Sequence, residues 1–161
     1  MSGSTENRAG PSEKPAAKSA IFSLEIAQRM LPLVQQIVGD IVQNHRLLDQ
    51  FAAEQRALDR DRRTLDWPRR QRRYQLRDDI AAAERTVQDA LSELEGLGLA
   101  LLIPQEGLVG FPTVVNGRKA YFSWKPNEET LRHWHFIGDS VRRKIPASWV
   151  ESSDQRLISE S

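Results

Sequence analysis

The stretch LRDDIAAAERTVQDALSELEGLGLALLI, residues 76–103, contains the change of pattern that decides the fold. Its first part has apolar residues at alternating steps of four and three, the spacing of one buried helix face. This row consists of Leu76, Ile80, Ala83, Val87, Ala90, Leu94 and Leu97. Gly96 and Gly98 then favour a helix C-cap. The continuous apolar run at 99–103 has the length of a strand. A helical part therefore passes into a β part here.

The chain before this helix carries a second apolar row with helical spacing. Ser23 is a suitable N-cap, and Glu25 follows in the first turn, where negative charge favours the helix dipole. The row runs through Met30, Val34, Ile37, Ile41, Leu48, Phe51 and Leu58. Pro32 predicts a kink or a short break. Two such helices with a short connector predict an antiparallel, coiled-coil-like helical hairpin over about residues 23–97.

The chain after residue 98 predicts three or four antiparallel strands over about residues 99–136. Residues 108–115 favour a second strand, in which Pro112 indicates an edge or a bulge. Asn116 and Gly117 predict a two-residue type I′ turn, because both positions of that turn need positive φ. Residues 118–125 and 131–136 are the third strand and a candidate fourth. The predicted fold class is α+β: a long helical hairpin followed by a small antiparallel β-meander.

Length and composition limit the functions open to this fold. The chain has 161 residues and a net charge of +1, so its overall charge favours neither nucleic acid nor membrane. It has no cysteine, which excludes disulfides and thiol chemistry. No apolar run approaches the ~20 residues that span a bilayer. We expect a cytoplasmic protein with one domain at 21–150, a disordered tail at 1–20 and a flexible tail at 151–161, because both ends are polar.

The sequence GLVGFPTVVNGRKAYFSWKPNEETLRHWH, residues 107–135, resembles a prokaryotic family known as domain of unknown function 2203. The helix opening FSLEIAQRMLPLV, residues 22–34, is also similar, and the resemblance covers about residues 21–146. It implies the α+β architecture and no established activity. The chain departs from the family pattern at Gly110, where relatives carry an acidic residue, and at Ser123, where they often carry cysteine. It also departs in the loop 138–146, where relatives tend to have a glycine-rich loop.

Three residues of the β part could form a metal site. His133 and His135 are two positions apart on a predicted strand, so both imidazoles point to one face. Glu128 or Asp139 could add a carboxylate. Two histidines and one carboxylate suit a divalent transition metal with open positions. The alternative is that these are ordinary strand residues, with His135 hydrogen-bonded beside Trp134.

Arginines cluster at the predicted hairpin tip. Residues 60–73 include seven arginines and two aspartates, a net charge of +5. Arginine binds phosphate and carboxylate, and an aromatic ring can stack on a base. The candidate anion- or nucleic-acid-binding residues are Arg62, Arg63, Arg69, Arg70, Arg72, Arg73 and Trp67. Residues 78–95 carry six acids and one arginine, a net charge of −5. The alternatives are therefore a solvated tip or antiparallel self-association, in which tip meets base.

These patterns favour a non-enzymatic module over an enzyme. The sequence has no phosphate-binding loop, no G-x-S-x-G elbow and no H-E-x-x-H motif. A further basic run at 142–144 could form a local anion site, but is interpreted as a polar loop after the last strand. We expect a protein-interaction or self-association module, with a protein partner or a second copy and no cofactor. The alternatives are a small metal- or ligand-binding protein, or an enzyme, centred on Glu128, His133 and His135, and nucleic-acid binding through the tip.

Overall fold

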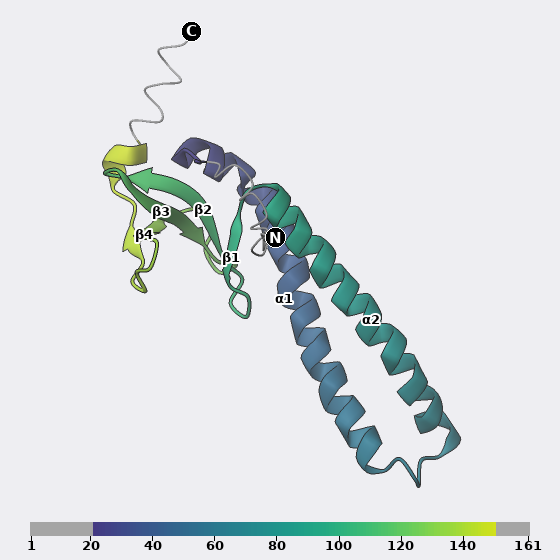
Figure 1. Cartoon of the computed structure of the whole chain (residues 1–161). Coiled ribbons are helices and arrows are strands. Elements are labelled where there is room, and N and C mark those ends of the chain that lie inside the picture. Colours follow the sequence, from purple (N-terminus) through teal and green to yellow (C-terminus); the bar gives the residue numbers. More distant parts are fainter. Residues whose placement is uncertain (1–20, 151–161) are drawn as a thin grey trace, which may run out of the picture.

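The computed structural model describes residues 21–150. The predicted tails at 1–20 and 151–161 lie outside the described residues. Within the described part, two long helices form an antiparallel hairpin and a five-stranded sheet lies at its base (Figure 1). The predicted α+β fold with a helical hairpin and a strand meander is thereby confirmed. None of the helices in residues 21–150 combines the length and apolar character that crossing a bilayer requires.

The helix ends follow the signals in the sequence. α1 spans Leu24–Arg60, and Ser23 caps it by accepting a hydrogen bond from the Ile26 backbone N–H. α2 spans Trp67–Gly96, capped in the same way by Asp66. At the other end of α2, the Leu99 N–H donates to the Leu94 carbonyl and the Gly98 N–H to the Glu95 carbonyl. Gly98 has a φ of 84°, so this end is a Schellman motif.

Pro32 does not break the first helix. α1 is continuous from Leu24 to Arg60 with Pro32 inside it. Figure 1 shows the first turns of α1 inclined to the rest of the helix. An interior proline removes one backbone hydrogen bond and its ring pushes against the preceding turn. We attribute the bend to this proline.

The sheet is a meander in which every strand pairs with its neighbour in the chain. Its strands are β1 (Ala100–Ile103), β2 (Leu108–Val115), β3 (Arg118–Trp124), β4 (His133–Phe136) and β5 (Arg143–Lys144). The turn between β2 and β3 has positive φ at both Asn116 and Gly117, as predicted. β5 adds a strand to the three or four predicted, and the basic run at 142–144 is in part this strand. Two charged residues carry no alternation that would signal a strand.

Pro112 lies in an inner strand, but at a place where that strand has a free edge. β1 pairs with β2 only as far as Gly110. Beyond that residue, no strand of the described chain lies on the side of β2 away from β3. The Phe22 N–H donates to the Pro112 carbonyl there. A proline is therefore tolerated, because no ladder hydrogen bond requires its missing N–H.

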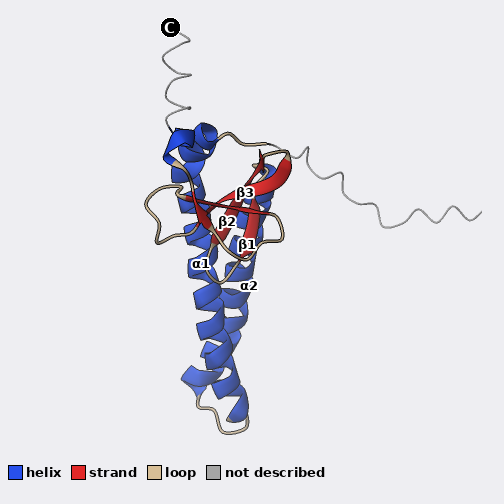
Figure 2. Ribbon diagram, turned by 90° about the vertical axis from the view of Figure 1, so that its left-hand side faces the viewer, coloured by secondary structure: helices blue, strands red, loops and turns tan. Residues whose placement is uncertain are grey.

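One face of the sheet packs against the base of the hairpin (Figure 2). Alternate residues of the strands point toward the helices, because side chains alternate across a strand. The sheet contributes Val109, Phe111, Ala120, Phe122, Trp124 and Trp134 to this core, and the helices contribute Val34, Ile37, Val38, Ile41, Ala90 and Leu94. The predicted row of α2 is thus largely buried.

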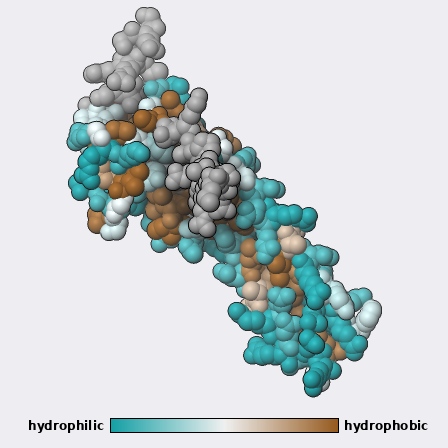
Figure 3. All heavy atoms as spheres, in the orientation of Figure 1, coloured by the Kyte–Doolittle hydropathy of each residue, from teal (hydrophilic) through white to brown (hydrophobic). Residues whose placement is uncertain are grey.

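The distal part of the hairpin extends away from the sheet (Figures 1 and 2). Here the predicted row of α1 turns partly toward solvent, and Leu48, Phe51 and Leu58 are only half-buried. Ile80 of α2 is half-buried as well, whereas Leu76 is fully buried. Figure 3 shows hydrophobic side chains between hydrophilic ones on the visible face of this part. Two helices alone therefore leave the distal part of the α1 row, and Ile80 of the α2 row, half-exposed.

Candidate functional site

The outer face of the sheet, opposite the helices, carries a cluster of buried polar side chains. The strand register brings Gly110, Ser123 and His133 side by side, and pairs Tyr121 with His135. Ser123 has no exposed surface, and His135 is 8% exposed. These positions alternate with the core positions, so they would face solvent if nothing covered them. The chain after β4 covers them.

Glu128 is the centre of this cluster. Its carboxylate accepts a hydrogen bond of 2.6 Å from Arg142 Nη2 and one of 3.1 Å from the Lys125 backbone N–H. The second carboxylate oxygen lies 2.7 Å from His133 Nδ1. The Trp124 Nε1 donates to the backbone carbonyl of Glu128 at 2.8 Å. The Glu128 side chain is only 11% exposed, so these contacts are well shielded from water. Glu128 thus stabilises the conformation of the loop between β3 and β4.

Arg142 holds the chain after β4 against the outer face of the sheet through hydrogen bonds to Ser123. Its Nε donates to the Ser123 hydroxyl and its Nη2 to the Ser123 carbonyl, both at 2.9 Å. Nη2 also donates to Glu128. Charge-assisted bonds of this kind are stronger than neutral ones. They hold the segment 137–142 as one wall of a cavity.

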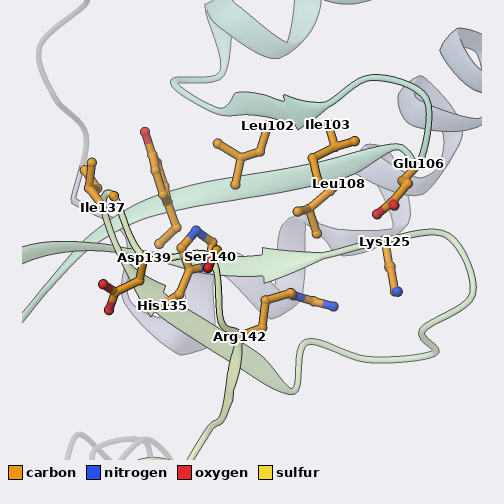
Figure 4. Close-up of a pocket in the computed structure, with 12 residues that line it drawn as sticks. Leu102, Ile103, Glu106, Leu108, Lys125, His135, Ile137, Asp139, Ser140 and Arg142 are labelled. Atoms are coloured by element: carbon orange, nitrogen blue, oxygen red, sulfur yellow. The ribbon is translucent and has the colours of Figure 1, made fainter.

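The cavity has a volume of about 550 Å³ and lies between this segment and the outer sheet face (Figure 4). Ligand cavities in proteins commonly measure about 300–1,000 Å³. Its apolar wall is formed by Leu102, Ile103, Leu108 and Ile137. Its polar wall includes Tyr121, Lys125, His135 and Arg142. The mixture of one apolar wall and a few polar groups is typical of a binding site.

His135 is the unusual polar group of the cavity. Its Nδ1 is buried and has no hydrogen-bond partner among the described residues. Burial lowers the pKa of His135 below its ordinary value of 6.5, and the nearby Arg142 charge lowers it further, against an opposing effect of Asp139. The imidazole is therefore neutral at pH 7 and has one donor and one acceptor nitrogen. Its ring lies 5.7 Å from that of Tyr121.

Gly110 gives Tyr121 the room it occupies. A Cβ at position 110 would lie 2.7 Å from Tyr121 Cδ1. Such an approach is too close for a real side chain, so Tyr121 would have to shift. Gly110 also pairs with Ser123 across β2 and β3. The two single positions that are predicted from the sequence to depart from the family pattern are thus direct neighbours.

The structure divides the predicted metal-binding residues. Glu128 contacts His133, while His135 lies in the cavity and forms no hydrogen bond with either. Among residues 21–150, no three His, Cys, Asp or Glu side chains are grouped so that they could hold a metal ion. The divalent metal stays a prediction. The sequence indicates Arg142 only as part of a basic run, and that position gives no sign of its contacts with Glu128 and Ser123.

The tip arginines form two groups. Arg72 pairs with Glu54 at 2.6 Å and with Asp79 at 3.1 Å, and Arg73 pairs with Asp59 at 2.9 Å. The hydrogen bond from Arg72 lowers the pKa of the Glu54 carboxyl below its usual value. These two arginines therefore hold α1 and α2 together.

The other tip arginines face solvent. Arg62, Arg63 and Arg69 are exposed and have no ion pair within residues 21–150. Arg70 donates from Nε to the Leu65 carbonyl. Trp67, at the start of α2, is 67% exposed. Anion or nucleic-acid binding by these residues stays a prediction.

Comparisons with known proteins give one family and no closer relative. No curated protein and no solved structure matches the chain. A family model described as an uncharacterised conserved protein, DUF2203, matches residues 20–145. This range includes both helices, all five strands, the Glu128 cluster and the cavity. The chain therefore belongs to the DUF2203 family of uncharacterised conserved proteins.

Proposed function

We propose that this protein is an interaction module whose helical hairpin associates, antiparallel, with the hairpin of a second copy. The observation that carries the proposal is the separation of charge along the hairpin. Residues 60–73 have a net charge of +5 and residues 78–95 a net charge of −5. In an antiparallel pair, each tip lies on the acidic stretch of the other copy. Both ends of the interface then bring opposite charges together.

Much of this charge has no ion-pair partner among residues 21–150. Arg62, Arg63 and Arg69 form no ion pair with the described residues. The same holds for the exposed acids of α2, which are Asp78, Glu84, Asp89, Glu93 and Glu95. Charges already paired within the chain, such as Arg72 with Glu54, would add little to an interface. The unpaired ones are free to face a partner of opposite charge.

The half-buried apolar residues support the same arrangement. The tip and the middle of the acidic stretch are about 30 Å apart along α2, at a rise of about 1.5 Å per residue. The midpoint between them lies near Leu76, and Phe51 lies opposite on α1, because Glu54 pairs with Arg72. Phe51 and Ile80 are only half-buried there. Two hairpins overlapped at this level would cover these side chains in a four-helix arrangement.

The test is the mass of the full chain in solution, measured by analytical ultracentrifugation over micromolar concentrations. We expect twice the chain mass of 18.3 kDa, and dissociation as salt is raised, because screening weakens exposed charges. A triple change of Arg62, Arg63 and Arg69 to Glu should leave a monomer. A triple change of Glu84, Glu93 and Glu95 to Arg should do the same. Mixing the two variants should restore a heterodimer.

The matched control is a triple change of Lys119, Arg132 and Lys144 to Glu. It changes the net charge by the same amount as the tip variant, but at exposed positions of the sheet and its loops. It should keep the mass of the wild type. A wild-type chain that stays a monomer at 100 µM (a chosen upper concentration) would overturn the proposal. The proposal would also be overturned if the tip variant and the control variant had the same mass in solution. A different outcome would assign the tip to nucleic-acid binding instead. In that case the tip variant alone would lose retention on a nucleic-acid column, and its mass would be unchanged.

A further inference from the structure

The cavity on the outer sheet face contains groups that the fold itself leaves unsatisfied. His135 is more than nine-tenths buried and lines the cavity, and its Nδ1 has no partner among residues 21–150. A buried polar atom without a hydrogen bond is costly, and native proteins rarely leave one. Figure 4 shows the His135 ring on the cavity side of the sheet, with the Lys125 and Arg142 side chains at the other end of the same cavity.

The charge inside the cavity is cationic, although its rim is mixed. Arg142 and Lys125 are both partly buried, whereas the lining carboxylates of Glu106 and Asp139 are exposed. Exposed charges are screened by water and salt more than partly buried ones. Arg142 donates from Nε and Nη2 to Ser123 and Glu128, and its Nη1 forms no hydrogen bond with the described residues. The Lys125 ammonium forms no ion pair with any described residue.

We infer that the cavity binds a small monocarboxylate with an apolar body. The carboxylate would be bound by the Lys125 ammonium and the free Nη1 edge of Arg142. The apolar body would lie against Leu102 and Leu108, and His135 would hydrogen-bond a polar atom of the ligand. A dianion such as phosphate fits less well, because one wall is apolar and because Glu106 and Asp139 would repel two negative charges more strongly than one.

This site is independent of self-association through the hairpin. The cavity lies on the face of the sheet that is turned away from α1 and α2, and no residue of either helix lines it. Either proposal can therefore fail without the other. Titration of the chain with a carboxylate tests ligand binding in the cavity, and the mass in solution tests self-association through the hairpin.

The experiment is a titration of the isotope-labelled full chain with sodium benzoate and with sodium 4-hydroxybenzoate, followed by amide and histidine side-chain NMR shifts. We expect saturable shifts at the cavity residues with both compounds. With 4-hydroxybenzoate, whose hydroxyl is a polar atom at the far end of the ring, we also expect a change in the ring-nitrogen shifts of His135. Lys125→Gln should weaken binding of both about tenfold or more, which is the usual effect of losing one charge-assisted hydrogen bond. His135→Phe keeps the aromatic ring and should weaken binding of 4-hydroxybenzoate.

The control variant is Lys119→Gln, which removes an exposed lysine from β3, the strand that Lys125 directly follows, and is not part of the cavity wall. It should bind benzoate as the wild type does. Benzamide, which has the same shape without the charge, should bind at least about tenfold more weakly. The inference is overturned if neither carboxylate gives saturable shifts, if benzamide binds equally well, if inorganic phosphate binds better, or if Lys119→Gln and Lys125→Gln weaken binding alike.

Discussion

The sheet end and the distal hairpin of this protein are stabilised in different ways. At the sheet end, the helices have a second layer to pack on, and side chains such as Phe111 and Trp124 are fully buried. In the distal hairpin each helix has, within residues 21–150, only the other helix as a neighbour, and Phe51 stays half-buried. A domain needs two packed layers to bury a core. The sheet end therefore supplies most of the stability, and the hairpin offers uncovered surface.

Core truncations at the two ends should differ most. Trp124→Ala removes a fully buried ring and its hydrogen bond to Glu128, and should lower the free energy of unfolding by about 3–5 kcal/mol. Leu48→Ala, at a half-buried position of the hairpin, should cost about 1 kcal/mol. Urea unfolding followed by circular dichroism, at a concentration where the chain is monomeric, measures both. Equal losses would mean that the two ends are stabilised alike.

Ion pairs at the two ends should differ less, but in the same direction. Glu128→Gln leaves the shielded Arg142 without its carboxylate, and we expect a loss of about 2–3 kcal/mol. Glu54→Gln breaks a more exposed pair with Arg72 and should cost less than about 1 kcal/mol. Glu129→Gln, at the exposed neighbouring position, is the control and should be close to neutral. The distinction between the ends weakens if the Glu54 and Glu128 variants lose the same stability.

The smallest effect is a difference in pH dependence. The pKa of His135 is lowered in the folded protein, mainly by burial, so the unfolded chain binds more protons at pH values below 6.5. Its contribution to stability is therefore present above pH 6.5 and is lost as the pH falls through the folded-state pKa. The pKa of Glu54 is also lowered, so its contribution is lost only below about pH 4.5.

Unfolding curves recorded from pH 8 to pH 3 separate these two contributions. His135→Phe should flatten the stability profile just below pH 6.5 and leave the more acidic part unchanged. Glu54→Gln should change only the acidic part. A His135→Phe variant whose profile runs parallel to that of the wild type would show that the buried histidine does not titrate with folding.

The sequence predicts the elements well because their signals are local. Ser23 caps α1 from within one turn, Gly98 ends α2, and Asn116 with Gly117 forms the turn between β2 and β3. Each of these signals requires only a few neighbouring residues. The strand alternation likewise placed the His133 and His135 side chains on one face of the sheet.

The site is less predictable because it depends on distant pairings. Arg142 reaches Ser123, 19 positions away, and Glu128, 14 positions away. No spacing rule links such residues before the order of the strands is known. Burial also separates residues that the spacing puts together, since His133 pairs with Glu128 while His135 is left in the cavity. The sequence indicates the residue types of the site, and the fold decides which of them meet.

The strand order has a kinetic consequence. Every strand pairs with its neighbour in the chain, and the two helices are also consecutive, so both units form through local contacts. Local contacts make for fast folding, because little loop-closure entropy is lost. The docking of the helical hairpin on the sheet joins residues far apart in the sequence. One such contact is the hydrogen bond that the Phe22 N–H, just before α1, donates to the Pro112 carbonyl. The folding transition state should therefore contain the formed helical hairpin and the formed strand meander, before the two have docked.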